Sequence, residues 1–206
     1  GMWKTTAEQN TLAAFARAFD AGFGIETDVR DCRGRLLISH NPPTGDEPGL
    51  EDCLALLRGR SLPLAINIKA DGLAEGVHDL CRRLQAPDWF VFDMSVPDMR
   101  QQLATGNPVY ARMSEVEKTP PWPEEAAGIW LDGFAALWYG EDTVASLLKR
   151  FRVCVVSQEL HGRDPAAQWA MLRPSASNAN LLLCTDRPAQ AKGYFQGDCH
   201  DQGHSF

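Results

Sequence analysis

Short apolar runs alternate with amphipathic segments along almost the whole chain, and this alternation most constrains the fold. The apolar runs predict strands at residues 25–30, 64–69, 89–94, 109–113, 128–131, 153–157 and 181–185. Strands that alternate with helices predict a parallel sheet. Because these strands lack an internal apolar-polar alternation, we expect both faces of the sheet to be covered.

The segments between these runs have helical spacing or turn chemistry. Leu12, Phe15, Ala16 and Phe19 recur at i, i+3, i+4 and i+7, which is typical of an amphipathic helix. The expected helices are residues 10–21, 50–57, 73–84, 98–104, 143–151, 165–172 and 188–194, with a return strand at 36–39. No glycine-rich dinucleotide fingerprint follows the first strand, which argues against a Rossmann fold.

Polar side chains gather where the expected strands end. They are Glu26 and Asp28, Asn67 and Lys69, Asp93 and Ser95, Arg112 and Ser114, Asp132, Ser157 and Glu159, and Thr185 and Asp186. Polar groups at successive carboxyl ends of parallel strands are typical of a TIM-barrel active site. We therefore expect an α/β fold of the TIM (β/α)8 type, forming one barrel domain over residues 1–195 with a polar tail at 196–206.

Only seven parallel strands can be counted, whereas a closed barrel of this class has eight. The segment before the first helix, residues 3–8, is too short and too polar for a core strand. We therefore expect strand one to be missing or truncated. The open seam that results could be covered by Trp3 and its neighbours or by a second subunit, so a homo-oligomer stays open.

Composition excludes several classes of function. The 206 residues carry a formal net charge of −7, which argues against nonspecific nucleic-acid binding. No apolar run approaches the roughly 20 residues of a membrane span, so we expect no stable membrane insertion. The six cysteines form no close CxxC pair, which argues against zinc. With no visible signal peptide, a cytoplasmic location is the default expectation.

Glu26 and Asp28 are two residues apart on one expected strand, so their side chains point to the same face. Adjacent carboxylates repel each other unless a cation lies between them, and oxygen ligands suit Mg²⁺ or Ca²⁺. His40 follows closely and brings an imidazole to the same region. The alternative interpretation is a structural pair bridged to Arg30 or Arg112.

Several short motifs, taken together, resemble the glycerophosphodiester phosphodiesterase family, which shares its barrel with phosphatidylinositol-specific phospholipases C. The matching segments are residues 9–15, 26–29, 38–41, 67–69 and 184–188. Two features depart from the family pattern. The His-Arg-Gly element is absent and by spacing would fall just before Met2, and Asn67 stands where the family has a glutamate.

The resemblance implies a divalent metal, Mg²⁺ or Ca²⁺, held by Glu26, Asp28 and Asn67, with ligand charge reduced from −3 to −2. It implies that His40 is the general acid and that Lys69 and Arg112 contact phosphate, with Lys69 counted among the catalytic residues. The general base of the family lies in the absent element. We therefore expect the chain as given to lack normal activity, unless His161 and Glu159 substitute.

Three functions stay open at this point. The first is a metal-dependent hydrolase in lipid metabolism that acts on a glycerophosphodiester or a similar small phosphodiester. The second is a noncatalytic barrel that binds a sugar phosphate or another phospho-ligand. The third is a lipid-directed phospholipase, ranked last because the loop at 41–49 is acidic and rich in proline. The sequence names neither the alcohol groups nor the metal.

Overall fold

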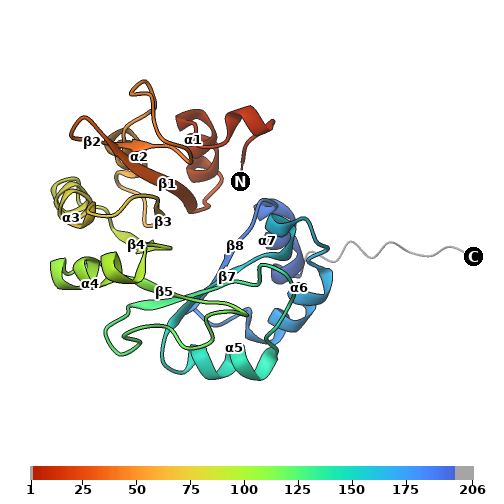
Figure 1. The fold of residues 1–206 in the computed structure, drawn as a ribbon. Helices are drawn as coiled ribbons and strands as arrows, with labels where there is room; N and C mark the ends of the chain where they lie inside the picture. Colours follow the sequence, from red (N-terminus) through yellow and green to blue (C-terminus); the bar gives the residue numbers. More distant parts are fainter. Residues whose placement is uncertain (1, 198–206) are drawn as a thin grey trace, which may run out of the picture.

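A computed structural model describes residues 2–197 and shows an open α/β fold built mainly from parallel strands (Figure 1). The strands are β1 (Ile25–Cys32), β2 (Arg35–Ile38), β3 (Pro63–Ile68), β4 (Asp88–Phe92), β5 (Tyr110–Met113), β6 (Gly128–Leu131), β7 (Arg152–Val156) and β8 (Leu181–Cys184). Among these strands, β1 and β2 pair as an antiparallel hairpin, and the other neighbouring strands pair in parallel. Gly1 and residues 198–206 of the predicted tail lie outside the described residues.

Helices follow most of the strands and lie outside them. They are α1 (Leu12–Asp20), α2 (Leu50–Leu57), α3 (Ala74–Arg83), α4 (Val96–Thr105), α5 (Glu141–Leu148), α6 (Ala166–Leu172) and α7 (Pro188–Gln196). Short 3-10 turns occupy Thr6–Glu8, Gln158–His161 and Arg173–Ser175. The predicted alternation of strands and helices is confirmed, with boundaries that differ by a few residues. No described helix is both long and apolar enough to span a membrane.

The strands form two four-stranded sheets, in the orders β2-β1-β3-β4 and β5-β6-β7-β8, rather than one closed barrel. A single parallel bridge between Val91 and Val109 connects them. The ladder is short at this point because Pro108 has no N–H to donate and because Asp93, at φ 66°, turns the chain away after β4. The parallel α/β fold is thus confirmed, whereas the expected barrel is split here.

The opening between β1 and β8 lies where the sequence predicts that strand one is missing. Within residues 2–197, β8 pairs only with β7, and residues 25–28 of β1 pair only with β3. The two strands therefore form the ends of one arc of parallel strands. We refer to the space between Ile25–Asp28 and Leu181–Cys184 as the seam.

Aromatic side chains fill the interior between the two sheets. The Phe90 ring stacks on the Tyr110 ring with centroids 3.7 Å apart, and the Phe92 ring stacks on the Trp130 ring at the same separation. Each stack joins a strand of one sheet to a strand of the other. Gly128 permits this packing, because a Cβ there would meet the Tyr110 ring at 2.6 Å.

Candidate functional site

The segment before α1 fixes the end of β1 through Asn10. The Asn10 side chain accepts a hydrogen bond from Thr27 Oγ1 (3.0 Å) and donates one to Asp28 Oδ2 (3.0 Å). Asn10 has φ 57°, a left-handed conformation that asparagine tolerates better than most residues. Thr11 then caps α1 by accepting from the backbone N–H of Ala14 (3.3 Å). The helix start therefore orients a candidate ligand.

Asp28 is the centre of the polar site. Its Oδ2 lies 3.1 Å from Nδ1 of His40, and its Oδ1 lies 3.4 Å from Nζ of Lys69. Asp28 is only 7% exposed, whereas the His40 side chain is 68% exposed. The arrangement holds one nitrogen of the imidazole against a buried carboxylate and leaves the rest of the ring accessible. The structure thus brings together three of the predicted site residues.

Glu26 lies two residues before Asp28 on β1, so the two side chains point to the same face of the strand. Both residues line a cavity that is described below. Burial, together with the smaller effect of repulsion from Asp28, raises the pKa of Glu26 from 4.5 to about 8, although Lys69 acts in the opposite direction. A carboxyl in this environment holds its proton at neutral pH unless a cation stabilises the charge. Glu26 is therefore suited to exchange a proton for a cation.

Asn67 lies on β3 and Lys69 directly follows this strand, and Asp93 lies beside both side chains. Asn67 pairs with Asp28 in the register of the sheet and donates from Nδ2 to Asp93 Oδ2 at 3.4 Å. Lys69 Nζ lies 3.9 Å from the same carboxylate oxygen. Asp93 was outside the residue set predicted for the site. Its position directly after a buried strand was the only signal that could have identified it.

Arg112 is paired with two carboxylates. It donates to Asp93 from Nη1 and to Glu117 from Nε at 2.5 Å, and its guanidinium lies 5.7 Å from the centre of the Phe134 ring. The hydrogen bond to Glu117 and the charge of Asp93 raise the pKa of Arg112, so it stays cationic. A phosphate that binds Arg112 would have to compete with these two partners.

The predicted metal ligands offer oxygen atoms that suit a hard cation, but they do not include three carboxylate, imidazole or thiol side chains grouped around one point. Asn67 Oδ1 is buried without a hydrogen-bond partner. This amide oxygen is therefore available to a cation, in the same region as the carboxyl groups of Glu26 and Asp28. Oxygen donors of this kind suit Mg²⁺ or Ca²⁺. However, residues 2–197 contain no group of three or more His, Cys, Asp or Glu side chains arranged to hold a metal. The donor set that remains is Glu26, Asp28 and Asn67.

His161 and Glu159, the predicted substitutes for a general base, have partners elsewhere. His161 Nε2 lies 2.7 Å from Asp132 Oδ1 at the end of β6. Glu159 accepts from the hydroxyl groups of Ser157 and Thr185 and from the backbone N–H of Asp186 (3.2 Å). Within residues 2–197, neither side chain forms a hydrogen bond with Asp28 or His40, so the structure does not bring them together with these two residues.

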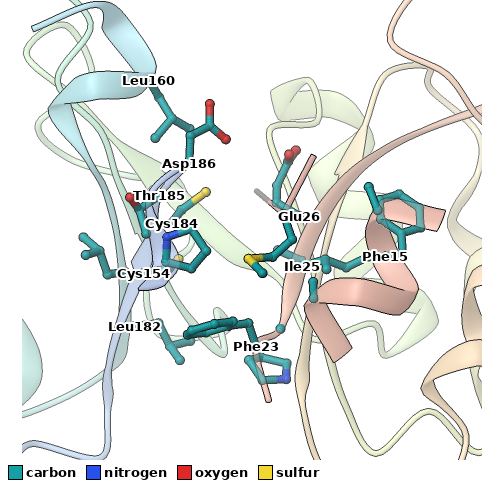
Figure 2. Close-up of a pocket in the computed structure, with 18 of the residues that line it drawn as sticks. Phe15, Phe23, Ile25, Glu26, Cys154, Leu160, Leu182, Cys184, Thr185 and Asp186 are labelled. Atoms are coloured by element: carbon teal, nitrogen blue, oxygen red, sulfur yellow. The ribbon is translucent and has the colours of Figure 1, made fainter. Parts of the chain in front are cut away.

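A cavity of about 480 Å³ runs along the seam beside this polar cluster. Figure 2 shows Glu26 and Ile25 on one side of it and Cys154, Leu182 and Cys184 on the other. His40, Asp28 and Asp186 line it at the carboxyl ends of the strands, and Phe23 and Pro63 line it near the amino ends. The cavity is therefore polar at one end and mainly apolar along its length.

Comparison with known proteins identifies the fold. No protein-family model matches the chain, and no curated protein matches it. The structure is similar to the crystal structure of a glycerophosphoryl diester phosphodiesterase from Parabacteroides distasonis ATCC 8503. The TM-score is 0.64, the sequences are 12% identical, and the match covers 91% of this chain and 81% of that chain. At this identity the similarity shows the fold, and at that level it agrees with the resemblance found in the sequence motifs.

Proposed function

We propose that this chain is a phosphodiester hydrolase that acts on a glycerophosphodiester or a similar small phosphodiester. The observation that carries the proposal is the contact of His40 with buried Asp28 beside Lys69, at the carboxyl end of parallel strands. This end of the sheet is where α/β barrels place their chemistry. The phosphodiesterase whose fold is similar gives further support at the level of architecture.

In this proposal His40 is the general acid. Nδ1–H donates to Asp28, which fixes the ring and directs the opposite nitrogen, Nε2, away from the carboxylate. Nε2–H then gives its proton to the alkoxide that leaves the phosphorus. The high exposure of the ring allows a substrate to approach it. Asp28 therefore acts as the group that orients the acid.

Lys69 and Arg112 supply positive charge for the phosphate. Lys69 lies between Asp28 and Asp93, and its ammonium is a flexible point charge that can shift toward an incoming anion. Arg112 can bind two oxygens of a phosphate if the anion displaces Asp93 or Glu117. The two cations contact the two different oxygens of the Asp93 carboxylate, so both lie next to the same side chain.

Glu26, Asp28 and Asn67 would hold a divalent cation, with Asn67 Oδ1 as the acceptor that has no partner inside the protein. When bound, such a cation neutralises charge on a nonbridging phosphate oxygen and makes the phosphorus more electrophilic. The protein contributes the positions of the three oxygens and a proton at Glu26 that can leave as the cation enters.

A noncatalytic phospho-ligand barrel is the second candidate. One observation favours it: among the described residues that line the cavity, His40 is the only histidine. A two-step proton transfer needs a base as well as an acid, and the imidazole of His161 is bound to Asp132 instead. In this case the cationic side chains would bind a sugar phosphate without cleaving it.

Hydrolysis and binding measurements on the same protein separate the two candidates. We expect the chain to cleave glycerophosphocholine or bis(4-nitrophenyl) phosphate with Mg²⁺ or Ca²⁺, and to lose this activity with EDTA and in Asp28→Asn. His78→Asn is the matched control, because His78 lies on α3 beside Asp79. If calorimetry shows that glycerol 3-phosphate binds and neither diester is cleaved, the chain is instead a noncatalytic barrel that binds a phospho-ligand.

A further inference from the structure

Exposed apolar side chains gather in the loops that follow the carboxyl ends of the strands. Within residues 2–197, the large apolar side chains that are at least 36% exposed are Val96, Val116, Trp122, Phe134, Leu137 and Leu160. All six follow β4, β5, β6 or β7 in the chain, and all but Trp122 come within the first few residues after the strand. Single exposed apolar residues are ordinary, but a gathered group marks an interaction site.

The densest part of this group lies beyond β5 and β6. We refer to Val116 and residues 134–137, which are Phe-Ala-Ala-Leu, as the apolar rim. All four residues of the second segment are exposed, Val116 is 78% exposed, and residues 133–140 carry no charge. Strands β7 and β8 stand between β6 and the seam, and β3 and β4 stand between β5 and β1. The exposure of the rim is therefore independent of whatever covers the seam.

Two charged side chains hold the backbone of the rim. Glu115 accepts from the N–H of Phe134 (3.1 Å) and from the N–H of Ala135 (2.5 Å). Arg163 donates to the C=O of Phe134 (2.7 Å) and to the C=O of Gly133. The hydrogen bond from Ala135 lowers the pKa of Glu115, so this carboxylate keeps a charge opposite to that of Arg163. These backbone groups have partners inside the protein, so they can enter an apolar medium without being left unpaired.

The rim adjoins a side chain that the proposed function assigns to phosphate. The centre of the Phe134 ring lies 5.7 Å from the guanidinium of Arg112. Val116 lies between Glu115, which holds the rim, and Glu117, which accepts from Arg112 at 2.5 Å. A phosphate at Arg112 would therefore lie beside exposed apolar side chains. The surface of a lipid layer presents the same combination, because its phosphates border its hydrocarbon.

Charge and hydrogen bonding favour a zwitterionic lipid layer over the other partners. The chain has a formal net charge of −7 and residues 133–140 are uncharged, so nothing in this loop attracts an anionic membrane. The side chains of the rim are Val, Phe, Ala and Leu, which form no hydrogen bonds. A protein interface carries about one hydrogen bond per 100–200 Å², whereas a lipid layer requires none.

We propose that the apolar rim inserts into the surface of a zwitterionic lipid layer and holds the candidate site against the phosphates of that layer. The proposal rests on the proposed hydrolase for the use of those phosphates, but the binding itself needs no catalysis. The acidic loop at 41–49, which ranked a lipid-directed enzyme last, is not part of the rim. Insertion of a few apolar side chains attaches a protein to a membrane surface without a spanning helix.

Binding to vesicles tests the proposal directly. The full chain is mixed with vesicles of dioleoylphosphatidylcholine without metal, and the bound fraction is measured by sedimentation. We expect Leu137→Ser and Ala136→Asp each to weaken binding by about tenfold or more, because one removes apolar area and the other must bury a charge. Ala55→Asp, at an exposed position on α2, is the matched control and should bind as the unmodified chain does. Circular dichroism checks that the variants fold.

Fluorescence shows which face is bound. Trp138 directly follows the rim, and its Nε1 donates to the C=O of Asp132 at 2.6 Å. We expect phosphatidylcholine that is brominated on its acyl chains to quench the tryptophan fluorescence of the bound chain. Trp138→Phe should remove most of this quenching, whereas Trp89→Phe, near the amino end of β4, should not.

Hydrolysis separates this proposal from the proposed function. We expect Ala136→Asp to leave the rate with soluble glycerophosphocholine unchanged and to lower the rate with lysophosphatidylcholine held in the same vesicles by at least about fivefold. If neither diester is cleaved but the vesicles bind through the rim, the proposed hydrolase fails and the lipid-binding surface stands.

Three results would overturn the proposal. The first is no binding at millimolar phosphatidylcholine. The second is binding that both Leu137→Ser and Ala136→Asp retain, or that requires phosphatidylserine and disappears at high salt, since either places the contact outside the rim. The third is a dimer in solution that Leu137→Ser dissociates, with no vesicle binding, which would assign the rim to a second copy of the chain. If Leu137→Ser does not fold, Ala136→Asp alters only an exposed methyl group and decides the question.

Discussion

At the scale of single residues, Asp28 organises the candidate site because both of its oxygens are used. Asn10 and His40 share one oxygen, and Lys69 lies beside the other. Within residues 2–197, Asn67 Oδ1 is a buried acceptor without a hydrogen-bond partner. This division assigns orientation of the acid to Asp28 and makes Asn67 the more available cation ligand.

Replacement of His40 should affect the two kinds of substrate differently. We expect His40→Asn to lower kcat for glycerophosphocholine by about 10²–10⁴-fold, because its alkoxide leaving group needs a proton. The loss should be much smaller for bis(4-nitrophenyl) phosphate, because nitrophenolate leaves without protonation. Steady-state rates with both substrates check this. Equal losses would show that His40 positions the substrate instead.

Glu26 should make the stability of the protein depend on pH. Its pKa is raised from 4.5 to about 8 in the folded state, so between these values the folded chain binds more protons than the unfolded chain. Stability from this group is therefore complete below about pH 4.5 and is lost as the pH rises toward 8, with a slope of up to about 1.4 kcal/mol per pH unit. Urea unfolding at pH 5, 6.5 and 8 should show this slope, and Glu26→Gln should flatten it.

Cation binding at Glu26 should release a proton. At pH 7 the carboxyl is mainly protonated, and a divalent ion can bind only the ionised form. Titration of MgCl₂ or CaCl₂ into weakly buffered protein should therefore acidify the solution by up to one proton per chain. Glu26→Gln should release none, and Glu51→Gln on the exposed surface of α2 is the matched control. Binding without proton release would place the cation elsewhere.

The sequence predicted the placement of some of these residues and not of others, for physical reasons. Glu26 and Asp28 follow from the two-residue period of a strand, and His40 follows from the hairpin that brings the chain back beside β1. Asp93 was not included in the predicted site because its position depends on a left-handed backbone conformation after β4, which no local sequence pattern predicts. The pairing of Arg112 with Glu117 likewise depends on how the following loop folds back.

At the scale of elements, a buried polar network connects α3, α4 and the start of β5. Asp98 accepts from the backbone N–H of Gly72 (2.8 Å) and from Gln102 Nε2 (3.0 Å). Asn107 donates to Gln102 Oε1 (2.6 Å) and to the C=O of Ala74 (3.0 Å). The network holds the loop after β3, and Lys69 stands at the start of that loop, two residues after Asn67.

Removal of Asp98 should therefore be costly. We expect Asp98→Ala to lower the free energy of unfolding by about 1–3 kcal/mol, because it leaves the buried Gln102 Nε2 without an acceptor and removes the acceptor of the Gly72 N–H. Chemical denaturation measures this loss. Asp142→Ala, at an exposed position in the first turn of α5, is the control and should change stability by well under 1 kcal/mol.

Element positions were predictable because periodicity reports local burial. Residues 50–57 and 128–131 were predicted with the observed bounds, and both carry a strong apolar pattern. The N-terminal end of α4 was predicted two residues late, at Asp98 rather than Val96. In the structure Pro97 occupies the first turn, where it needs no N–H partner, after the Ser95 cap.

At the scale of the whole molecule, side chains connect the two sheets where the backbone ladder hardly does. One bridge joins Val91 to Val109, and the Phe90–Tyr110 and Phe92–Trp130 stacks cross the same boundary. Arg152 of β7 also binds both carboxylate oxygens of Asp88 at the start of β4. The split between the sheets could not be predicted from apolar runs, because those runs give strand positions and not ladder lengths.

If the interior stacks couple the sheets, weakening one stack should destabilise the whole chain in a single step. Phe92 is 1% exposed, so Phe92→Ala should lower the free energy of unfolding by about 3–5 kcal/mol. Val116→Ala, at a position that is 78% exposed, is the control and should have little effect. Denaturation should be followed by tryptophan fluorescence and by far-UV circular dichroism. Because both sheets share the interior cluster, the two midpoints should move together. A Phe92→Ala variant in which the fluorescence midpoint falls while the dichroism midpoint stays would instead show two sheets that unfold independently, and the seam would then separate two weakly coupled halves.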